Sequence, residues 1–195
     1  LFGAKEKNII FTSGGSESNN LAIKGTLGTY SNRGKHIIIS SIEHASVHNQ
    51  AQRLEEEGFQ VSYLPVDKNG FVNLDKLGEL IRKDTILVSI MHVNNEIGTI
   101  QDLKSIGNLI KEKNSNTIFH VDAVASFGKL PMKISEWKAD LVSVSGHKIH
   151  APKGVGALYI RDGLKLRSLV DGGSQEFGMR AGTENSIGIV GFGEA

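Results

Sequence analysis

The amino-acid sequence predicts an α/β fold of three layers, with helices on both faces of a mostly parallel sheet. Short apolar runs recur along the chain, and several are continuous rather than alternating, which is typical of strands buried on both faces. The intervals between the runs leave room for helices, so right-handed crossovers are expected. Two of these intervals also carry apolar residues at helical spacing, with charged residues opposite.

Seven apolar runs are predicted to form the strands. They cover residues 9–11, 37–39, 61–64, 86–91, 118–121, 141–144 and 155–160. Apolar residues that share one helical face predict two of the helices between the strands. The first set is Val47, Ala51 and Leu54, and the second is Leu103, Ile106 and Ile110.

Turn and cap residues predict the remaining elements. Residues 67–70, Asp-Lys-Asn-Gly, are expected to form a turn, and Asn73 to cap a short helix over residues 74–82. Another helix is expected to open at the Gly-Gly pair of residues 14–15. Glycines are dense after Asp171, so little regular structure is expected there before a helix begins near the last residues.

Composition favours a single domain. A chain of 195 residues, 39% of them hydrophobic, can bury one sizeable core. The 22 basic and 21 acidic side chains give a net charge of +1 without a basic block, which argues against nucleic acid or a membrane surface as partner. No apolar run approaches the roughly 20 residues of a membrane span, no signal peptide opens the chain, and cysteine is absent. We therefore expect a cytoplasmic protein without disulfides.

Two residues in the stretch 119–160 point to a cofactor. Asp122 ends a predicted buried strand, and Lys148 lies in a polar turn between two later predicted strands. A lysine can hold the aldehyde of pyridoxal 5'-phosphate (PLP) as a Schiff base, and an acid can keep the ring nitrogen of PLP protonated. Taken singly, each residue is more often a solvated lysine or a strand-capping aspartate, so the pair needs further support.

Six motifs supply that support. In chain order they are FTSGGSESNNLAIKG, EHASVHN, MHVNNEIGTIQ, HVDAVASFGKLP, SGHKIHAPKGVGALY and GGSQEFGMRAGTEN. Their order and spacing resemble those of NifS/IscS-type cysteine desulfurases, which form part of the class V aminotransferase branch of fold-type I PLP enzymes. The resemblance implies that residues 1–195 form one PLP-binding large domain of the aspartate aminotransferase-like fold. The small-domain segments of the family are expected to lie outside these residues.

The turn at residues 13–16, Ser-Gly-Gly-Ser, precedes a predicted helix and suits an anion. Free N–H groups and the positive end of the helix dipole would face such a ligand. The turn matches neither the Walker motif nor the dinucleotide fingerprint, and on its own it is more often only a tight turn. The resemblance implies that Gly15 and Ser16 form a phosphate cup, with Ser145 and His147 as its other wall.

The resemblance also implies roles for five further residues. His44 is expected to stack on the pyridine ring and to take part in proton transfer, and Asn95 to lie near the phenolic oxygen of PLP. Lys148 would first hold the cofactor and then act as general base at the substrate's α carbon, while Asp122 keeps the ring nitrogen charged. Thr183 is expected to reach the phosphate site of the other subunit, which implies a homodimer.

A metal site is the competing interpretation of one of these residues. His44 and His48 lie four residues apart on one face of a predicted helix, which is a spacing that zinc ligands use. No HExxH motif, cysteine or third ligand accompanies the pair, so no metal is expected.

Three features depart from the family pattern. Ala125 stands where the family usually has a glutamine that hydrogen-bonds the phenolic oxygen, and Phe177 stands where a basic residue is common. The chain has no cysteine, whereas in a desulfurase a cysteine on a mobile loop takes up the sulfur. We therefore expect that this segment is inactive alone and that the loop belongs to another part of a longer protein.

The activity that the resemblance implies is sulfur transfer from L-cysteine, which yields L-alanine and an enzyme persulfide. The sulfur would pass to an acceptor or scaffold protein, towards iron–sulfur cluster assembly or tRNA thiolation. Another class V enzyme, such as a selenocysteine lyase or an aminotransferase, is an alternative. So is a non-catalytic scaffold that retains the fold. A nucleotide-binding α/β module is a more distant alternative, because both phosphate fingerprints are missing.

Overall fold

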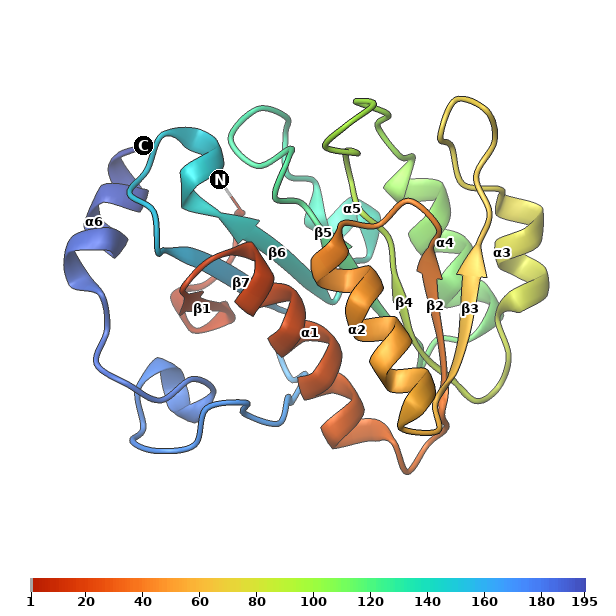
Figure 1. The fold of residues 1–195 in the computed structure, drawn as a ribbon, viewed down its shortest axis with the longest axis horizontal. Helices are drawn as coiled ribbons and strands as arrows, with labels where there is room; N and C mark the ends of the chain where they lie inside the picture. The colour runs from red at the N-terminus through yellow and green to blue at the C-terminus, as the bar shows by residue number, and fades with distance from the viewer. Residues whose placement is uncertain (1) are drawn as a thin grey trace.

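A seven-stranded sheet in the order β1-β7-β6-β5-β4-β2-β3 runs through the middle of the molecule (Figure 1). The computed structural model describes residues 2–195. Each apolar run predicted from the sequence forms one strand, and the predicted fold class is therefore confirmed. The strands are β1 (Ile9–Thr12), β2 (His36–Ser40), β3 (Gln60–Leu64), β4 (Thr85–Ser89), β5 (Ile118–Asp122), β6 (Leu141–Ser145) and β7 (Gly156–Ile160).

The sheet is mostly parallel, as predicted, and β7 is the exception. Strands β2 to β6 pair in parallel, whereas β7 pairs antiparallel with both β6 and β1. The connection from β6 to β7 holds only a short 3₁₀ helix, η2 (Gly146–Ile149), and a few loop residues. It is too short for the crossover that a parallel pair needs, so the chain returns antiparallel.

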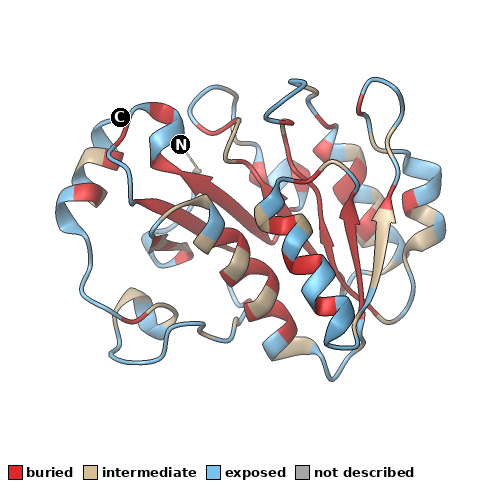
Figure 2. Cartoon of the chain, in the orientation of Figure 1, coloured by how far each residue is buried: buried red, intermediate tan, exposed pale blue. Residues whose placement is uncertain are grey.

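Helices cover both faces of the sheet, which confirms the three predicted layers (Figure 1). On one face α1 (Gly15–Tyr30) and α2 (Ala45–Glu56) pack against the strands, and on the other lie α3 (Leu74–Leu80), α4 (Leu103–Lys113) and α5 (Ile134–Trp137). The inner strands β2, β4, β5, β6 and β7 are almost entirely buried, the edge strands β1 and β3 only in part, and the outer sides of the helices are exposed (Figure 2). Several strands are continuously apolar because helices cover both faces of the sheet.

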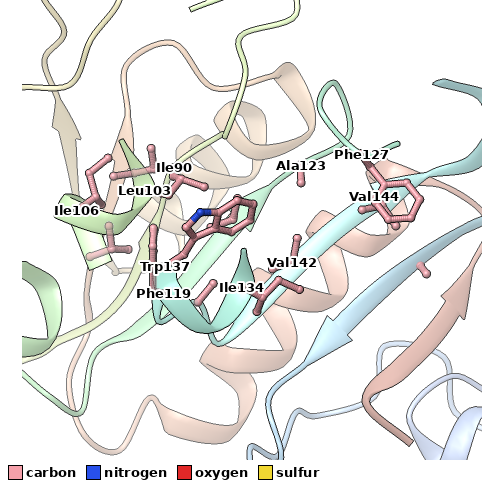
Figure 3. Packing of buried hydrophobic residues seen from close by; sticks show 14 of the residues in the cluster. Ile90, Leu103, Ile106, Phe119, Ala123, Phe127, Ile134, Trp137, Val142 and Val144 are labelled. Carbon is pink, nitrogen blue, oxygen red and sulfur yellow. The ribbon is translucent and has the colours of Figure 1, made fainter. Parts of the chain in front are cut away.

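The core on the α4 and α5 face is built around two aromatic residues. Trp137 ends α5 and packs in the same cluster as Phe119 of β5, together with apolar residues of α4 (Figure 3). The ring of His92, in the loop after β4, lies 4.6 Å from the Trp137 ring. The same cluster extends to Ala123, which directly follows the last residue of β5.

Some boundaries differ from those predicted. Asn73 does cap α3, since its Oδ1 accepts a 3.0 Å hydrogen bond from the N–H of Lys76, but the helix ends at Leu80 rather than at residue 82. The last residues form α6 (Ser186–Glu194), after a stretch with only a short 3₁₀ helix, η3 (Glu176–Gly178). A further 3₁₀ helix, η1 (Glu6–Asn8), precedes β1. Among the described residues, no helix is both long and apolar enough to cross a membrane.

Candidate functional site

A cavity of about 320 Å³ lies at the carboxyl ends of β5 and β6, beside the first turn of α1. The carboxyl ends of parallel strands are where ligands of open α/β sheets usually bind. The structure brings eight of the nine predicted site residues to this cavity. They are Gly15, Ser16, His44, Asn95, Asp122, Ser145, His147 and Lys148.

The first turn of α1 forms one wall of the cavity and suits an anion. Gly14 precedes the helix with φ of +150°, a backbone conformation that side chains disfavour. A Cβ on Gly15 would lie 2.6 Å from Cγ2 of Val124, so a larger residue would not fit there. The first hydrogen bond of the helix runs from the N–H of Ser18 to the Gly14 carbonyl. The N–H groups of residues 15–17 thus have no partner within the helix and are available to a ligand.

The wall next to this turn carries Ser145 and His147, which contact each other; a Cβ on Gly14 would lie 3.6 Å from the Ser145 Oγ. The Oγ of Ser145 lies 2.8 Å from Nδ1 of His147. Ser145 is the buried last residue of β6, whereas His147 is exposed in η2. The two predicted phosphate walls therefore face one cavity, although their binding of phosphate stays a prediction.

Asp122 is a buried carboxylate at the end of β5. Asp122 is only 4% exposed. Its carboxylate accepts hydrogen bonds from the Val124 N–H (2.9 Å) and from Nδ2 of Asn19 (2.8 Å). Burial raises the pKa of Asp122, while these two hydrogen bonds and the nearby His44 oppose the rise. A cationic ligand group beside Asp122 would favour the ionised form.

Lys148 lies in η2, directly after β6. Because β5 and β6 are paired, with Asp122 opposite Ser143, the aspartate and the lysine are presented from adjacent strand ends, as predicted. The predicted polar turn is a 3₁₀ helix. Within residues 2–195, no side-chain hydrogen bond or ion pair engages Nζ of Lys148, so this amine is available to react.

His44 caps the N-terminus of α2 and lines the cavity. Its Nδ1 accepts a 3.0 Å hydrogen bond from the Ser46 N–H and lies 2.8 Å from the Ser46 Oγ. His48, the other residue of the zinc alternative, packs its ring 5.4 Å from that of Tyr63. In the part of the chain that the structure describes, no three His, Cys, Asp or Glu residues are grouped so that they could hold a metal ion.

Asn95 lies in the loop after β4 and is exposed at the cavity. Its neighbour Asn94 is buried, and its Oδ1 accepts hydrogen bonds from the N–H groups of Glu96 and Ile97. Asn94 thus holds the turn that presents Asn95. Ala125 lines the same cavity, so the departure from the family pattern falls at the site.

Thr183 is the predicted site residue that lies outside the cavity. It borders a smaller pocket of about 170 Å³, together with Arg180 and Glu184. The guanidinium of Arg180 pairs with Glu17 of α1 (Nε to Oε1, 2.8 Å) and so ties this loop to the helix that forms the cavity wall. The contact of Thr183 with a second subunit stays a prediction.

The structure also reveals residues that the sequence did not single out. Asn19 and Ser46 line the cavity, and Glu43 is buried next to it, with its Oε1 accepting a hydrogen bond from the N–H of Met91. Asn19 could have been found, because it lies four residues after Gly15 and so shares its helix face.

Comparisons with known proteins show the family of the chain. The family model of aminotransferase class-V matches residues 1–195. The cysteine desulfurase IscS of Dictyoglomus turgidum is 54% identical over 193 residues, which are 99% of this chain and 48% of that protein. The IscS of Methanosarcina thermophila is also 54% identical over 193 residues, 99% of this chain and 47% of that protein.

Solved structures give the same result. A NifS-like protein matches with a TM-score of 0.97 at 44% identity, over 100% of this chain and 53% of that one. A structure of SspA in complex with cysteine matches with a TM-score of 0.94 at 45% identity, over 99% and 56% of the two chains. The resemblance that the six motifs predicted is confirmed. The chain spans about half the length of the curated relatives it matches.

Proposed function

The chain belongs to the aminotransferase class V family, and on that premise we propose that it is the PLP-binding large domain of a cysteine desulfurase. The reaction of the whole protein would remove sulfur from L-cysteine and leave L-alanine, with the sulfur passed on as a persulfide. The observation that carries the proposal is that Asp122 and Lys148 line one cavity together with the open N-terminus of α1.

The residues of the cavity suit PLP in three respects. The unpartnered N–H groups of the first turn of α1, with Ser145 and His147 beside them, suit a phosphate. The buried carboxylate of Asp122 suits a protonated ring nitrogen, and the amine of Lys148 suits an aldehyde. The volume of about 320 Å³ lies within the usual range for small-ligand sites.

When bound, PLP supplies an electron sink for the negative charge that forms at the substrate's α carbon. The residues of the chain would support this chemistry in separate ways. Asp122 would hold the proton on the ring nitrogen, and His44 would pack against the ring. Lys148 would attach the cofactor and, once released by the substrate amine, move the proton at the α carbon. Asn95 would orient the substrate carboxylate.

Two parts of the proposal reach beyond this chain. The thiol that takes up the sulfur would come from outside residues 1–195, which contain no cysteine. Thr183 would complete the phosphate site of a second copy, so the working unit would be a homodimer. The names of the relatives support L-cysteine as substrate, since one solved neighbour is in complex with cysteine.

A test uses the purified chain mixed with PLP, with absorbance spectra followed by borohydride reduction and mass analysis. We expect a visible absorbance band and a reduced cofactor fixed at Lys148, and we expect both to be lost in Lys148→Ala. Lys153→Ala is a matched control, because Lys153 is exposed in the same connection but does not line the cavity. A band that survives in Lys148→Ala, or an adduct on another lysine, would contradict the proposal.

A further inference from the structure

We propose that Asn19 and Ser46 are positioning residues, which join Asp122 to His44 through a hydrogen-bond chain of fixed direction. The inference deepens the proposed function, because Asp122 and His44 are the two residues proposed to bind the ring of the cofactor. The chain crosses three elements, from the end of β5 through α1 to the start of α2.

The contacts are continuous. Nδ2 of Asn19 lies 2.8 Å from Oδ2 of Asp122 and 2.8 Å from Oγ of Ser46. The Ser46 Oγ in turn lies 2.8 Å from Nδ1 of His44. Asn19 is 1% exposed, so its bond to Asp122 is protected from water, where hydrogen bonds are stronger. The Ser46–His44 bond at the other end is exposed.

The direction of the chain follows from its two ends. An ionised Asp122 can only accept, so Asn19 presents its NH₂ group, which has two hydrogens and serves both Asp122 and Ser46. The reverse orientation would set Oδ1 of Asn19 against the carboxylate. Oδ1 is buried and has no hydrogen-bond partner among the described residues. The unpaired, buried Oδ1 of Asn19 is unfavourable. The two hydrogen bonds that its NH₂ group donates offset this cost, which supports the assigned orientation.

The other end is fixed by a main-chain donor. The Ser46 N–H donates to Nδ1 of His44 at 3.0 Å, and a main-chain N–H cannot reverse its role. Nδ1 is therefore an acceptor in neutral His44, so the ring carries its proton on Nε2. The Ser46 hydroxyl accepts from Asn19 and donates to the same Nδ1. The chain thus fixes one tautomer of His44 and the acceptor role of Asp122 together.

Other titratable groups surround this hydrogen-bond chain, and their charges could affect the measured titrations. Glu17, His147 and Lys148 line the same cavity, and Glu43 lies close enough to act on the charge of Asp122. The variants below leave all four groups in place, so changes in the spectra report on Asn19 and Ser46.

The experiment is NMR of the ¹³C,¹⁵N-labelled chain without PLP. In Asn19→Ala we expect the titration midpoint of the Asp122 carboxyl to rise by about one pH unit or more, since a hydrogen bond to its charged form is lost. In Ser46→Ala the ¹⁵N resonance of the His44 Nδ1 should move towards that of a nitrogen with fewer hydrogen bonds, and Ser46→Thr should restore it. Asn19→Ala should move the same resonance, although Asn19 does not contact His44.

Asn20→Ala is the control, because the Asn20 side chain donates to the Ser16 carbonyl and takes no part in the chain. It should leave both readouts unchanged. If Asn19→Ala does not fold, Asn19→Ser, whose side chain is too short to reach Asp122, makes the same comparison. An unchanged Asp122 midpoint, or a wild-type His44 protonated on Nδ1 in its neutral form, would overturn the inference. Because PLP is absent, this result is independent of the attachment test at Lys148.

Discussion

The carboxyl group of Glu43 accepts a 2.7 Å hydrogen bond from the main-chain N–H of Met91, and this bond joins the loop after β2 to the loop after β4 beside the cavity. The Oγ of Ser40 donates to the same oxygen, Oε1, while Oε2 is buried without a partner among the described residues. Burial raises the pKa of Glu43 to about 8, and the nearby charge of Asp122 adds to the rise.

This shift makes a prediction about stability. Between about pH 4.5 and about pH 8 the unfolded chain releases the Glu43 proton while the folded chain keeps it, so this group lowers the free energy of unfolding as pH rises through that window. In Glu43→Gln the decline should be smaller by a few kcal/mol across the window. Urea unfolding at several pH values measures how the free energy of unfolding changes with pH. The exposed Glu57→Gln should keep the wild-type slope, and parallel wild-type and Glu43→Gln profiles would refute the prediction.

Asp122→Asn tests the proposed charge at the ring nitrogen. The variant keeps the shape of the side chain and removes its charge, so we expect the dissociation constant for PLP to rise roughly tenfold or more. Because burial already raises the pKa of Asp122, the folded chain should lose little stability at pH 8. Titration with PLP and urea unfolding give the two readouts. Asp75→Asn, on exposed α3, should change neither, and unaltered PLP affinity in Asp122→Asn would refute the role.

A buried carboxylate that binds two partly exposed cations predicts a large effect at Asp140. This residue is 2% exposed and binds Nζ of Lys111 (2.6 Å), Nε of Arg161 (2.5 Å) and the N–H of Phe119 (2.8 Å). Asp140→Ala leaves the buried N–H of Phe119 without its acceptor and two partly exposed cations without their partner, so it should lower the free energy of unfolding by about 2–3 kcal/mol.

Asp162 offers a surface comparison for Asp140. It pairs with Lys7 at 2.9 Å, but its side chain is 57% exposed. Asp162→Ala should therefore leave the midpoint of urea unfolding nearly unchanged. Equal losses in the two variants would show that burial does not set the strength of the Asp140 network.

The packing of α4 on α5 predicts a severe effect of a single methyl group. A Cβ on Gly107 would lie 1.8 Å from the carbonyl oxygen of Trp137, so Gly107→Ala must push the two helices apart. We expect a loss of at least about 2 kcal/mol, seen as a lower midpoint in thermal unfolding. Gly78→Ala is the matched control in α3, where the nearest atom would lie 3.5 Å away; the higher helix propensity of alanine should leave it neutral or stabilising. A neutral Gly107→Ala would contradict this packing.

The strands could be predicted because burial on both faces leaves continuous apolar runs, and the cavity could be predicted because its residues belong to motifs. Asn19 and Glu43 lie within two of these motifs, but their contacts could not be predicted from the sequence. Asn19 lies beside Asn20 in the sequence, yet only Asn19 faces the cavity, and that difference is set by the packing of α1 on the sheet. In the sequence, Glu43 cannot be distinguished from other acidic loop residues. Its contact with Met91 depends on how the loops after β2 and β4 pack in the folded protein. The position of Thr183 relative to a second subunit is not set by contacts within one chain.

The position of β1 at the edge of the sheet has a consequence for how the protein is made. Its strand partner is β7, with Thr12 opposite Gly156, so β1 cannot join the sheet until residues 156–160 have been synthesised. At the roughly 5–20 residues per second of translation, that delay is roughly 7 to 30 seconds. The Gly14-Gly15 turn follows directly after β1. This turn is synthesised early but is fixed in place late. A nascent chain that already contains Asp122 and Lys148 therefore still lacks the completed anion-binding wall.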